Sequence, residues 1–127
     1  MSDKTIAQKL LIKEGHTFLL LNAPRGYKAT LGALPPKVNV LTKPKGSADI
    51  VQAFVTSKQQ LAEQLIGLRA ALAPQGILWI TYPKGTASIQ SDINRDSIRA
   101  FAAPFGLEAV AICAVDDDWS ALRLKAV

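Results

Sequence analysis

The chain has 127 residues, 49% of them hydrophobic and 20% charged, and a net charge of +5 at pH 7. This composition is typical of one globular domain with its own core, and the single cysteine and single histidine exclude a disulfide framework and a Cys/His zinc site. Every apolar run is shorter than the roughly 20 residues of a membrane span, and no basic segment followed by an apolar stretch marks a secretory signal. We therefore expect a cytoplasmic protein without membrane contact. We also expect no metal centre.

The first part of the chain predicts two short helices and two strands. Residues 17–21 (TFLLL) form a continuous apolar run, which is typical of a strand buried on both faces of a parallel sheet. Ser2 or Asp3 can cap a helix before this strand, because both residue types accept hydrogen bonds from free helical N–H groups. The elements expected in this part are, in order, a helix ending before Gly15, a strand at 17–21, a helical segment near 28–34 and a strand at 38–41.

The middle of the chain contains its clearest helix. Ser57 and Gln60 have the spacing of a capping box, and four leucines follow on one face of the helix, at positions 61, 65, 68 and 72. Pro74 and Gly76 are expected to end this helix, since neither residue type favours its continuation. The strands expected on either side of the helix lie at 49–55 and 77–82.

The last part of the chain predicts a helix and a β-hairpin. Asn94 can cap the helix, with Ile93 and Ile98 at the two positions of a hydrophobic staple, and Gly106 follows its end. Asp116-Asp117-Asp118 has the composition of a tight turn, in which neighbouring carboxylates point to different sides rather than toward one cation. The strands expected around this turn lie at 108–115 and 119–125, and their short connection makes them antiparallel.

Strands alternate with helical segments, and the apolar residues of the strands are continuous rather than alternating. This pattern predicts an α/β fold, a three-layer Rossmann-like sandwich with helices on both faces of a mainly parallel six-stranded sheet. We expect the strand order 2-1-3-4-6-5, with strand 6 antiparallel, in one domain that spans residues 1–127. The connection at 42–47 is too short for a crossover helix, so the first half of the fold is reduced.

Several stretches of the chain resemble known proteins. The stretch from Asp49 to Lys125, which ends in helix, strand, tight turn and antiparallel strand, resembles the second half of a class I methyltransferase fold. Six short motifs are Ala7-Gln8-Lys9-Leu10, Ala48-Asp49-Ile50-Val51, Gly76-Ile77-Leu78-Trp79, Pro83-Lys84-Gly85, Asp118-Trp119-Ser120 and Leu122-Arg123-Leu124. Through these motifs the chain is similar to a small family of bacterial proteins that has no assigned reaction. The similarity implies a bacterial protein of this fold and leaves its chemistry open.

The methyltransferase resemblance implies an S-adenosylmethionine site over the first strand, with a Gly-rich turn and an acidic residue at the end of the second strand. Here the turn is Asn22-Ala23-Pro24-Arg25-Gly26, with one glycine, and the second strand ends in Leu41-Thr42-Lys43, without a carboxylate. Both departures count against this ligand. We therefore expect no cofactor, and binding of S-adenosylmethionine no tighter than about 1 mM.

Open α/β sheets bind ligands beyond the carboxyl ends of their strands, where the strand order reverses, which here lies between the first and third strands. Ser57 begins the best helix, whose free N–H groups favour an anion, and Arg25 and Lys84 add positive charge. In a simpler interpretation, Ser57 is only a helix cap and Lys84 only a solvated lysine. The ligand-binding residues predicted at this edge are Asn22, Pro24, Arg25, Gly26, Tyr27, Thr56, Ser57, Lys84 and Gly85.

The positions of the single histidine and the single cysteine do not favour nucleophilic catalysis. His16 lies at the amino-terminal edge of the first strand, roughly 20 Å from the opposite edge, so it cannot act as a base for a serine there. Cys113 lies within an apolar run, where a cysteine is most often a small packing residue. We therefore predict no catalytic residue.

The leading hypothesis for function is a non-catalytic domain that binds a small anionic ligand or acts as an interaction module. The alternative is a degenerate or atypical S-adenosylmethionine-dependent methyltransferase, with Asn22, Gly26, Ser57 and Lys84 nearest the cofactor. Basic residues are scattered and aromatic residues make up 6%, so nucleic acid is not an expected partner. The strand from Glu108 to Val115 forms an apolar sheet edge, where we expect a homodimer contact or another cover.

Overall fold

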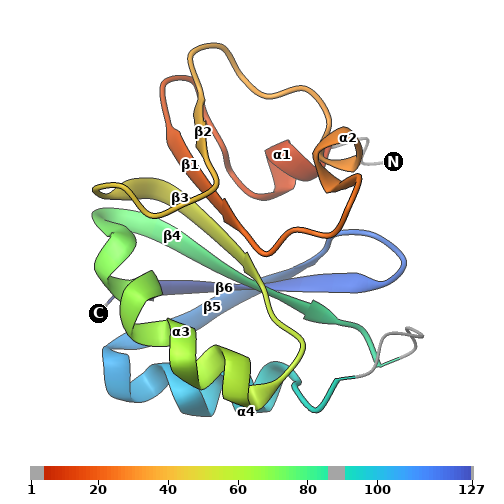
Figure 1. The fold of residues 1–127 in the computed structure, drawn as a ribbon, viewed down its shortest axis with the longest axis vertical. Coiled ribbons are helices and arrows are strands. Elements are labelled where there is room, and N and C mark those ends of the chain that lie inside the picture. The colour runs from red at the N-terminus through yellow and green to blue at the C-terminus, as the bar shows by residue number, and fades with distance from the viewer. Residues whose placement is uncertain (1–4, 86–90, 127) are drawn as a thin grey trace.

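A computed structural model describes residues 5–85 and 91–126 as a sheet with helices on both faces. Figure 1 shows one pair of helices packed on each side of the sheet. On one face lie α1 (Ile6–Lys9) and α2 (Tyr27–Leu31). On the other face lie α3 (Lys58–Ala71), α4 (Arg95–Ala102) and the short 3-10 helix η1 (Ala103–Phe105).

The sheet has six strands in the order β2-β1-β3-β4-β6-β5. The strands are β1 (Thr17–Leu21), β2 (Asn39–Leu41), β3 (Ala48–Phe54), β4 (Leu72–Pro83), β5 (Leu107–Ala114) and β6 (Trp119–Ala126). The first four strands are parallel, and β6 is antiparallel to both β4 and β5. The predicted fold class, strand order and antiparallel strand 6 are therefore confirmed.

Two clusters of buried side chains, one on each face, form the core. The first contains Leu61, Leu65 and Leu68 of α3 together with Ile98 of α4, so the leucine face predicted from the sequence is the buried one. The second gathers α1, α2 and aromatic residues of the strands. The middle strands are buried by both clusters, which explains why their apolar residues are continuous rather than alternating.

The end of α3 differs from the prediction that Pro74 and Gly76 terminate it. The helix already ends at Ala71, and both residues lie inside β4, which begins at Leu72. At Gly76 a Cβ atom would lie 3.0 Å from the carbonyl oxygen of Ala48, because the strand backbones approach closely there. The glycine thus serves strand packing rather than helix termination.

The predicted caps are partly confirmed. Asn94 accepts from the Ser97 backbone N–H at 2.9 Å in a capping box at the start of α4. The N-cap of α1 is Thr5, whose side chain accepts from the backbone N–H of Gln8, whereas the predicted caps Ser2 and Asp3 lie outside the described residues. A side chain directly before the first helical residue is the one that can reach the free N–H groups.

The acidic turn is confirmed as a hairpin turn. The Asp116 carboxylate accepts from the backbone N–H groups of Asp118 at 2.8 Å and of Trp119 at 2.9 Å. This arrangement is an Asx turn, in which the side chain replaces a backbone acceptor. In the described part of the chain, no group of three acidic, histidine or cysteine residues could hold a metal ion.

Candidate ligand-binding site

The strand order reverses between β1 and β3, because β2 pairs with the outer side of β1 and β3 with its inner side. The carboxyl ends of all three strands lie at the same edge of the sheet. A crevice is expected at such a switch point, since the connections leave in opposite directions. Two cavities open there, one on each face of the sheet, and Asn22 lines both.

The first cavity, which we call the α2 cavity, lies on the face covered by α1 and α2. Its volume is about 390 Å³, within the roughly 300–1,000 Å³ of small-molecule sites. The residues that line it are Leu20, Asn22, Ala23, Pro24, Gly26, Tyr27, Lys28 and Thr42. It therefore contains four of the predicted ligand-binding residues, namely Asn22, Pro24, Gly26 and Tyr27.

Backbone conformation shapes the wall of the α2 cavity. Asn22 has a φ of 60° and Gly26 a φ of 84°, so the chain turns sharply after β1 and again before α2. Asparagine and glycine are the residue types that adopt this left-handed region most readily. The Tyr27 backbone N–H donates to the Pro24 carbonyl at 3.1 Å, which closes the turn.

A buried polar chain fixes the floor of this cavity. The Tyr27 hydroxyl donates to the Gln52 Oε1 at 2.9 Å, and the Gln52 Nε2 donates to the Thr81 hydroxyl at 3.0 Å. Gln52 and Thr81 are fully buried in β3 and β4. Burial raises the pKa of Tyr27 well above its ordinary value, so the ring stays neutral and anchors α2 to the sheet.

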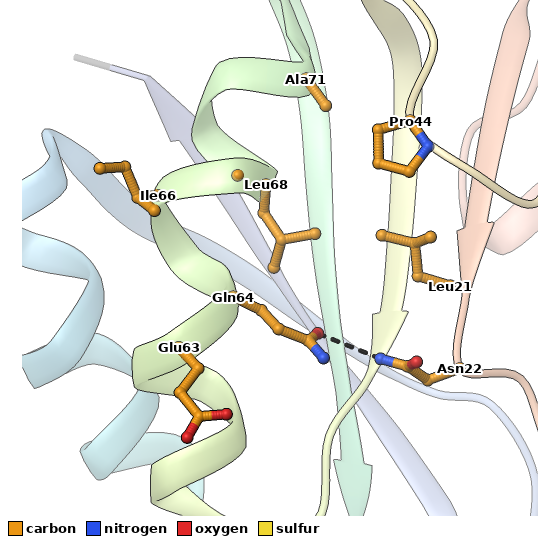
Figure 2. Close-up of a pocket in the computed structure, with 9 residues that line it drawn as sticks. Leu21, Asn22, Pro44, Glu63, Gln64, Ile66, Leu68 and Ala71 are labelled. Carbon is orange, nitrogen blue, oxygen red and sulfur yellow. Dashed lines mark hydrogen bonds between the residues drawn. The ribbon is translucent and has the colours of Figure 1, made fainter.

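The second cavity, which we call the α3 groove, lies on the opposite face and is mostly apolar. Its volume is about 330 Å³, and Leu21, Pro44, Gly67, Leu68 and Ala71 supply most of its walls. Figure 2 shows the Asn22 side chain reaching from the end of β1 toward Gln64 of α3. The Asn22 Nδ2 donates to the Gln64 Oε1 at 3.1 Å, so this contact links the end of the strand to the helix.

The other predicted site residues lie outside the α2 cavity. The Ser57 hydroxyl accepts from the Gln60 backbone N–H at 3.0 Å, while the Thr56 backbone N–H donates to the Gln60 side chain at 2.9 Å. The Asp92 carboxylate accepts from the Lys58 backbone N–H at 2.8 Å, which places a negative charge at the start of α3. These contacts give Ser57 the role of a cap.

The remaining basic residues of the prediction are spread along this edge. Arg25 is exposed in the turn before α2, and Lys84 and Gly85 follow β4. The Lys84 backbone N–H donates to the Asp118 carbonyl at 2.8 Å, which ties this loop to the hairpin turn. The α2 cavity takes none of its described lining from these three residues.

Sequence reasoning missed Lys28 and Thr42 in the α2 cavity. Lys28 directly follows the predicted site residue Tyr27, and Thr42 directly follows β2, where a carboxylate was sought and a hydroxyl stands. The one charged side chain in the described lining is that of Lys28, and no carboxylate lines the cavity. Its electrostatic character therefore favours an anion over a cation.

His16 and Cys113 have structural roles. The His16 Nδ1 accepts from the Lys13 backbone N–H at 3.1 Å, at the amino-terminal edge of the sheet. Cys113 is half-buried in β5, and its burial raises the pKa of the thiol, which disfavours the reactive thiolate. Neither side chain lines the α2 cavity.

The fold is shared with solved structures of methyltransferases. The chain resembles an S-adenosylmethionine-dependent methyltransferase from Aquifex aeolicus, with a TM-score of 0.62 and 12% identity over 94% of this chain and 87% of that one. It also resembles Aeropyrum pernix fibrillarin with bound S-adenosyl-L-methionine, with a TM-score of 0.61 and 15% identity over 94% and 72%. For TrmN from Thermus thermophilus the TM-score is 0.61 and the sequence identity 14%, over 96% of this chain and 47% of that one. This chain therefore spans about half of that protein.

At these identities the comparisons establish a class I methyltransferase-like fold of the Rossmann type. No family model matches the sequence, so the resemblance to a bacterial family stays a prediction. No curated protein matches it either. In the described ranges, no helix has the length and apolar character needed to cross a membrane.

Proposed function

We propose that this protein binds a nucleoside-containing ligand in the α2 cavity, where methyltransferases of this fold hold their cofactor. The observation that carries the proposal is the position of the cavity, at the carboxyl ends of β1 and β2 beside the reversal in strand order. Its volume of about 390 Å³ suits a ligand of nucleoside size. The similarity in fold to S-adenosylmethionine-dependent methyltransferases supports the same position.

The lining fits a nucleoside better than it fits the whole of S-adenosylmethionine. Leu20 and Pro24 offer apolar walls to a base, and the polar groups of Asn22 and Thr42 can bond to ribose hydroxyls. S-adenosylmethionine has a net positive charge, because its sulfonium and ammonium groups outnumber its one carboxylate, whereas the described lining contains Lys28 and no carboxylate. The donor set therefore disagrees with the charged end of this cofactor.

Two functions follow from two different observations. The fold similarity favours an atypical S-adenosylmethionine-dependent methyltransferase. The charge of the cavity favours a protein that binds a nucleoside phosphate or a similar small anion, because Lys28 is the one charged residue of the described lining. The two are separated by the charge of the preferred ligand.

Calorimetry with S-adenosylmethionine, S-adenosylhomocysteine and adenosine monophosphate tests the proposal. These ligands share adenosine and differ in charge, so their order of affinity reports the electrostatics of the site. We expect the wild type to bind adenosine monophosphate best and S-adenosylmethionine no tighter than about 1 mM. If none of the three binds at millimolar concentration, the nucleoside proposal is wrong. Micromolar binding of S-adenosylmethionine would establish the methyltransferase alternative instead.

A single substitution sharpens this test. Thr42→Asp places a carboxylate just after the second strand, inside the cavity lining. We expect it to strengthen binding of S-adenosylmethionine and to weaken binding of adenosine monophosphate. Ser47→Asp is the matched control, because it adds the same charge to the same connection at an exposed position outside the lining. Equal effects of the two variants would show that the charge acts at long range, not in the cavity.

A further inference from the structure

Strand β5 forms one edge of the sheet and exposes large aliphatic side chains. It pairs only with β6 in the sheet order, so its outer side has no neighbouring strand among the described residues. Val110 is 42% exposed and Ile112 is 47% exposed. Exposed, long and apolar edge strands favour pairing with another chain, which proteins usually prevent.

The exposed part of β5 also lies beside two arginines. Arg95 and Arg99, one turn apart on α4, line the same hollow of about 200 Å³ as Val110 and Ile112. The register of β5 against β6 shifts between Ala109 and Ala111, which leaves Val110 as the extra residue of a bulge. The surface therefore combines an unpaired backbone edge, two aliphatic side chains and two positive charges.

We propose that this surface, the β5 edge with Arg95 and Arg99, docks an acidic extended segment of a partner protein. Added as a strand beside β5, such a segment supplies backbone groups to the free edge. Its carboxylates reach Arg95 and Arg99, and the methylene groups of glutamate side chains cover Val110 and Ile112. The Ala114 carbonyl already accepts from the Lys9 ammonium at 3.2 Å, so that carbonyl has a partner at the end of β5.

A second copy of the chain fits the same edge less well. If two β5 strands paired antiparallel, a two-fold axis perpendicular to the sheet would place both copies of α4 on one face. Arg95 and Arg99 of both copies would then lie close together at the dimer interface. Like charges brought together destabilise an interface. The one acidic residue of β5, Glu108, lies opposite Lys125 of β6. The charge of this surface is thus complementary to an acidic partner.

Fluorescence anisotropy with labelled peptides tests this proposal. The probes are two short blocked peptides, one of alternating valine and glutamate and one of alternating valine and lysine. We expect the acidic peptide to bind and the basic peptide not to bind. The Arg99→Glu variant should lose at least about tenfold in affinity for the acidic peptide. Lys13→Glu, the same charge reversal at an exposed position far along the sequence, should change the affinity little.

Three results would overturn the proposal. The first is binding of neither peptide, or of both equally, by a protein whose circular dichroism shows that it is folded. The second is an equal loss of affinity in Arg99→Glu and Lys13→Glu. The third is a dimer in light scattering that Ile112→Lys converts into a monomer, because a second copy would then cover the edge. Ile66→Lys, a change at the other strongly exposed isoleucine, is the control for this last result.

Discussion

The two edges of the sheet differ in length and in chemistry. Strand β2 has three residues, Asn39–Leu41, and is followed by the connection that contains Pro44. Strand β5 has eight residues and exposes Val110 and Ile112. The short edge is protected from pairing by its length, whereas the long edge offers backbone and aliphatic groups over several residues.

The comparison separates two roles. At the short edge the connection between β2 and β3 contains no helix, and Pro44 of this connection lines the α3 groove, while the α2 cavity lies at the carboxyl ends of β1 and β2. At the long edge the complete arrangement of α4, β5 and β6 leaves the strand itself uncovered. The α2 cavity thus lies toward the short edge, whereas the surface proposed for a partner lies at the long edge.

The largest effect that tests this comparison is expected from a matched pair of leucine substitutions. Leu124 of β6 is fully buried beside the long edge, and Leu41 of β2 is partly buried at the short edge. Leu124→Ala should lower the free energy of unfolding by about 2–5 kcal/mol, the range for a buried leucine that leaves a cavity. Leu41→Ala should cost less, because its site can relax into solvent. Urea denaturation measures both.

If Leu41→Ala destabilises as much as Leu124→Ala, the short edge contributes as much to the core as the long one. The distinction between a reduced half and a complete half would then fail. As a control, the free energy of unfolding should depend on urea concentration with the same slope in both variants, which indicates that both unfold from the same native state.

The second effect concerns Tyr27, which closes the floor of the cavity. Tyr27→Phe leaves the buried Gln52 acceptor without its donor and should cost about 1–3 kcal/mol. Burial raises the pKa of Tyr27 above 10.0, so its contribution to stability is complete below pH 10 and is lost as the pH rises toward the folded-state pKa. Chemical denaturation between pH 9 and 11 should show this loss in the wild type and a smaller loss in Tyr27→Phe.

Two other groups contribute to the same alkaline slope. Burial also raises the pKa of Tyr82 and of Cys113. Some loss of stability at high pH therefore remains in Tyr27→Phe, and Tyr82→Phe is the matched control. Identical pH profiles of Tyr27→Phe and the wild type would contradict the assignment of a buried, neutral phenol.

The third effect compares the two capping boxes. Asn94→Ala removes the cap of α4, an eight-residue helix beside the long edge, and should cost about 1 kcal/mol. Thr5→Ala removes the cap of α1, which has four residues, and should cost less because few backbone hydrogen bonds depend on it. Thermal melts of the two variants measure the difference. A larger loss in Thr5→Ala would contradict the expectation that the cost of losing a cap grows with the length of the helix.

Lys28→Gln is expected to have the smallest effect on stability of these substitutions and a large effect on ligand binding. This side chain is exposed and lines the α2 cavity, so Lys28→Gln should change the free energy of unfolding by no more than about 0.5 kcal/mol. Its affinity for adenosine monophosphate should fall by about tenfold. Lys45→Gln, an equal change at an exposed position outside the lining, should leave the affinity unchanged. Equal affinities of the two variants would remove Lys28 from the site.

Much of the fold could be predicted because it rests on local patterns. The leucine face of α3, formed by Leu61, Leu65 and Leu68, and the apolar run of β1 fix which faces are buried, and the short connection at the Asp116 turn fixes an antiparallel strand. The end of α3 could not be predicted, because Gly76 is explained by its contact with Ala48, which is distant in sequence. A residue type alone does not distinguish a helix stop from a close approach of strands.

The sequence indicates the position of the α2 cavity better than it indicates the residues that line it. Asn22, Pro24, Gly26 and Tyr27 follow directly from the end of β1, and all four line the α2 cavity. The roles of Gln52 and Gln64 depend on hydrogen bonds across the sheet and to a helix, which no spacing in the sequence indicates. Ser57 satisfies the same pattern whether it caps a helix or binds an anion, and only its contact with Gln60 distinguishes them.

The central claim is that a nucleoside-containing ligand binds in the α2 cavity. The most direct measurement is an NMR titration that follows the backbone amides of the protein as adenosine monophosphate and S-adenosylmethionine are added in turn. We expect the amide resonances of Asn22, Gly26, Lys28 and Thr42 to shift most and those of β5 to stay unchanged. Shifts confined to other parts of the molecule, or no shift at millimolar concentration of either ligand, would contradict the claim.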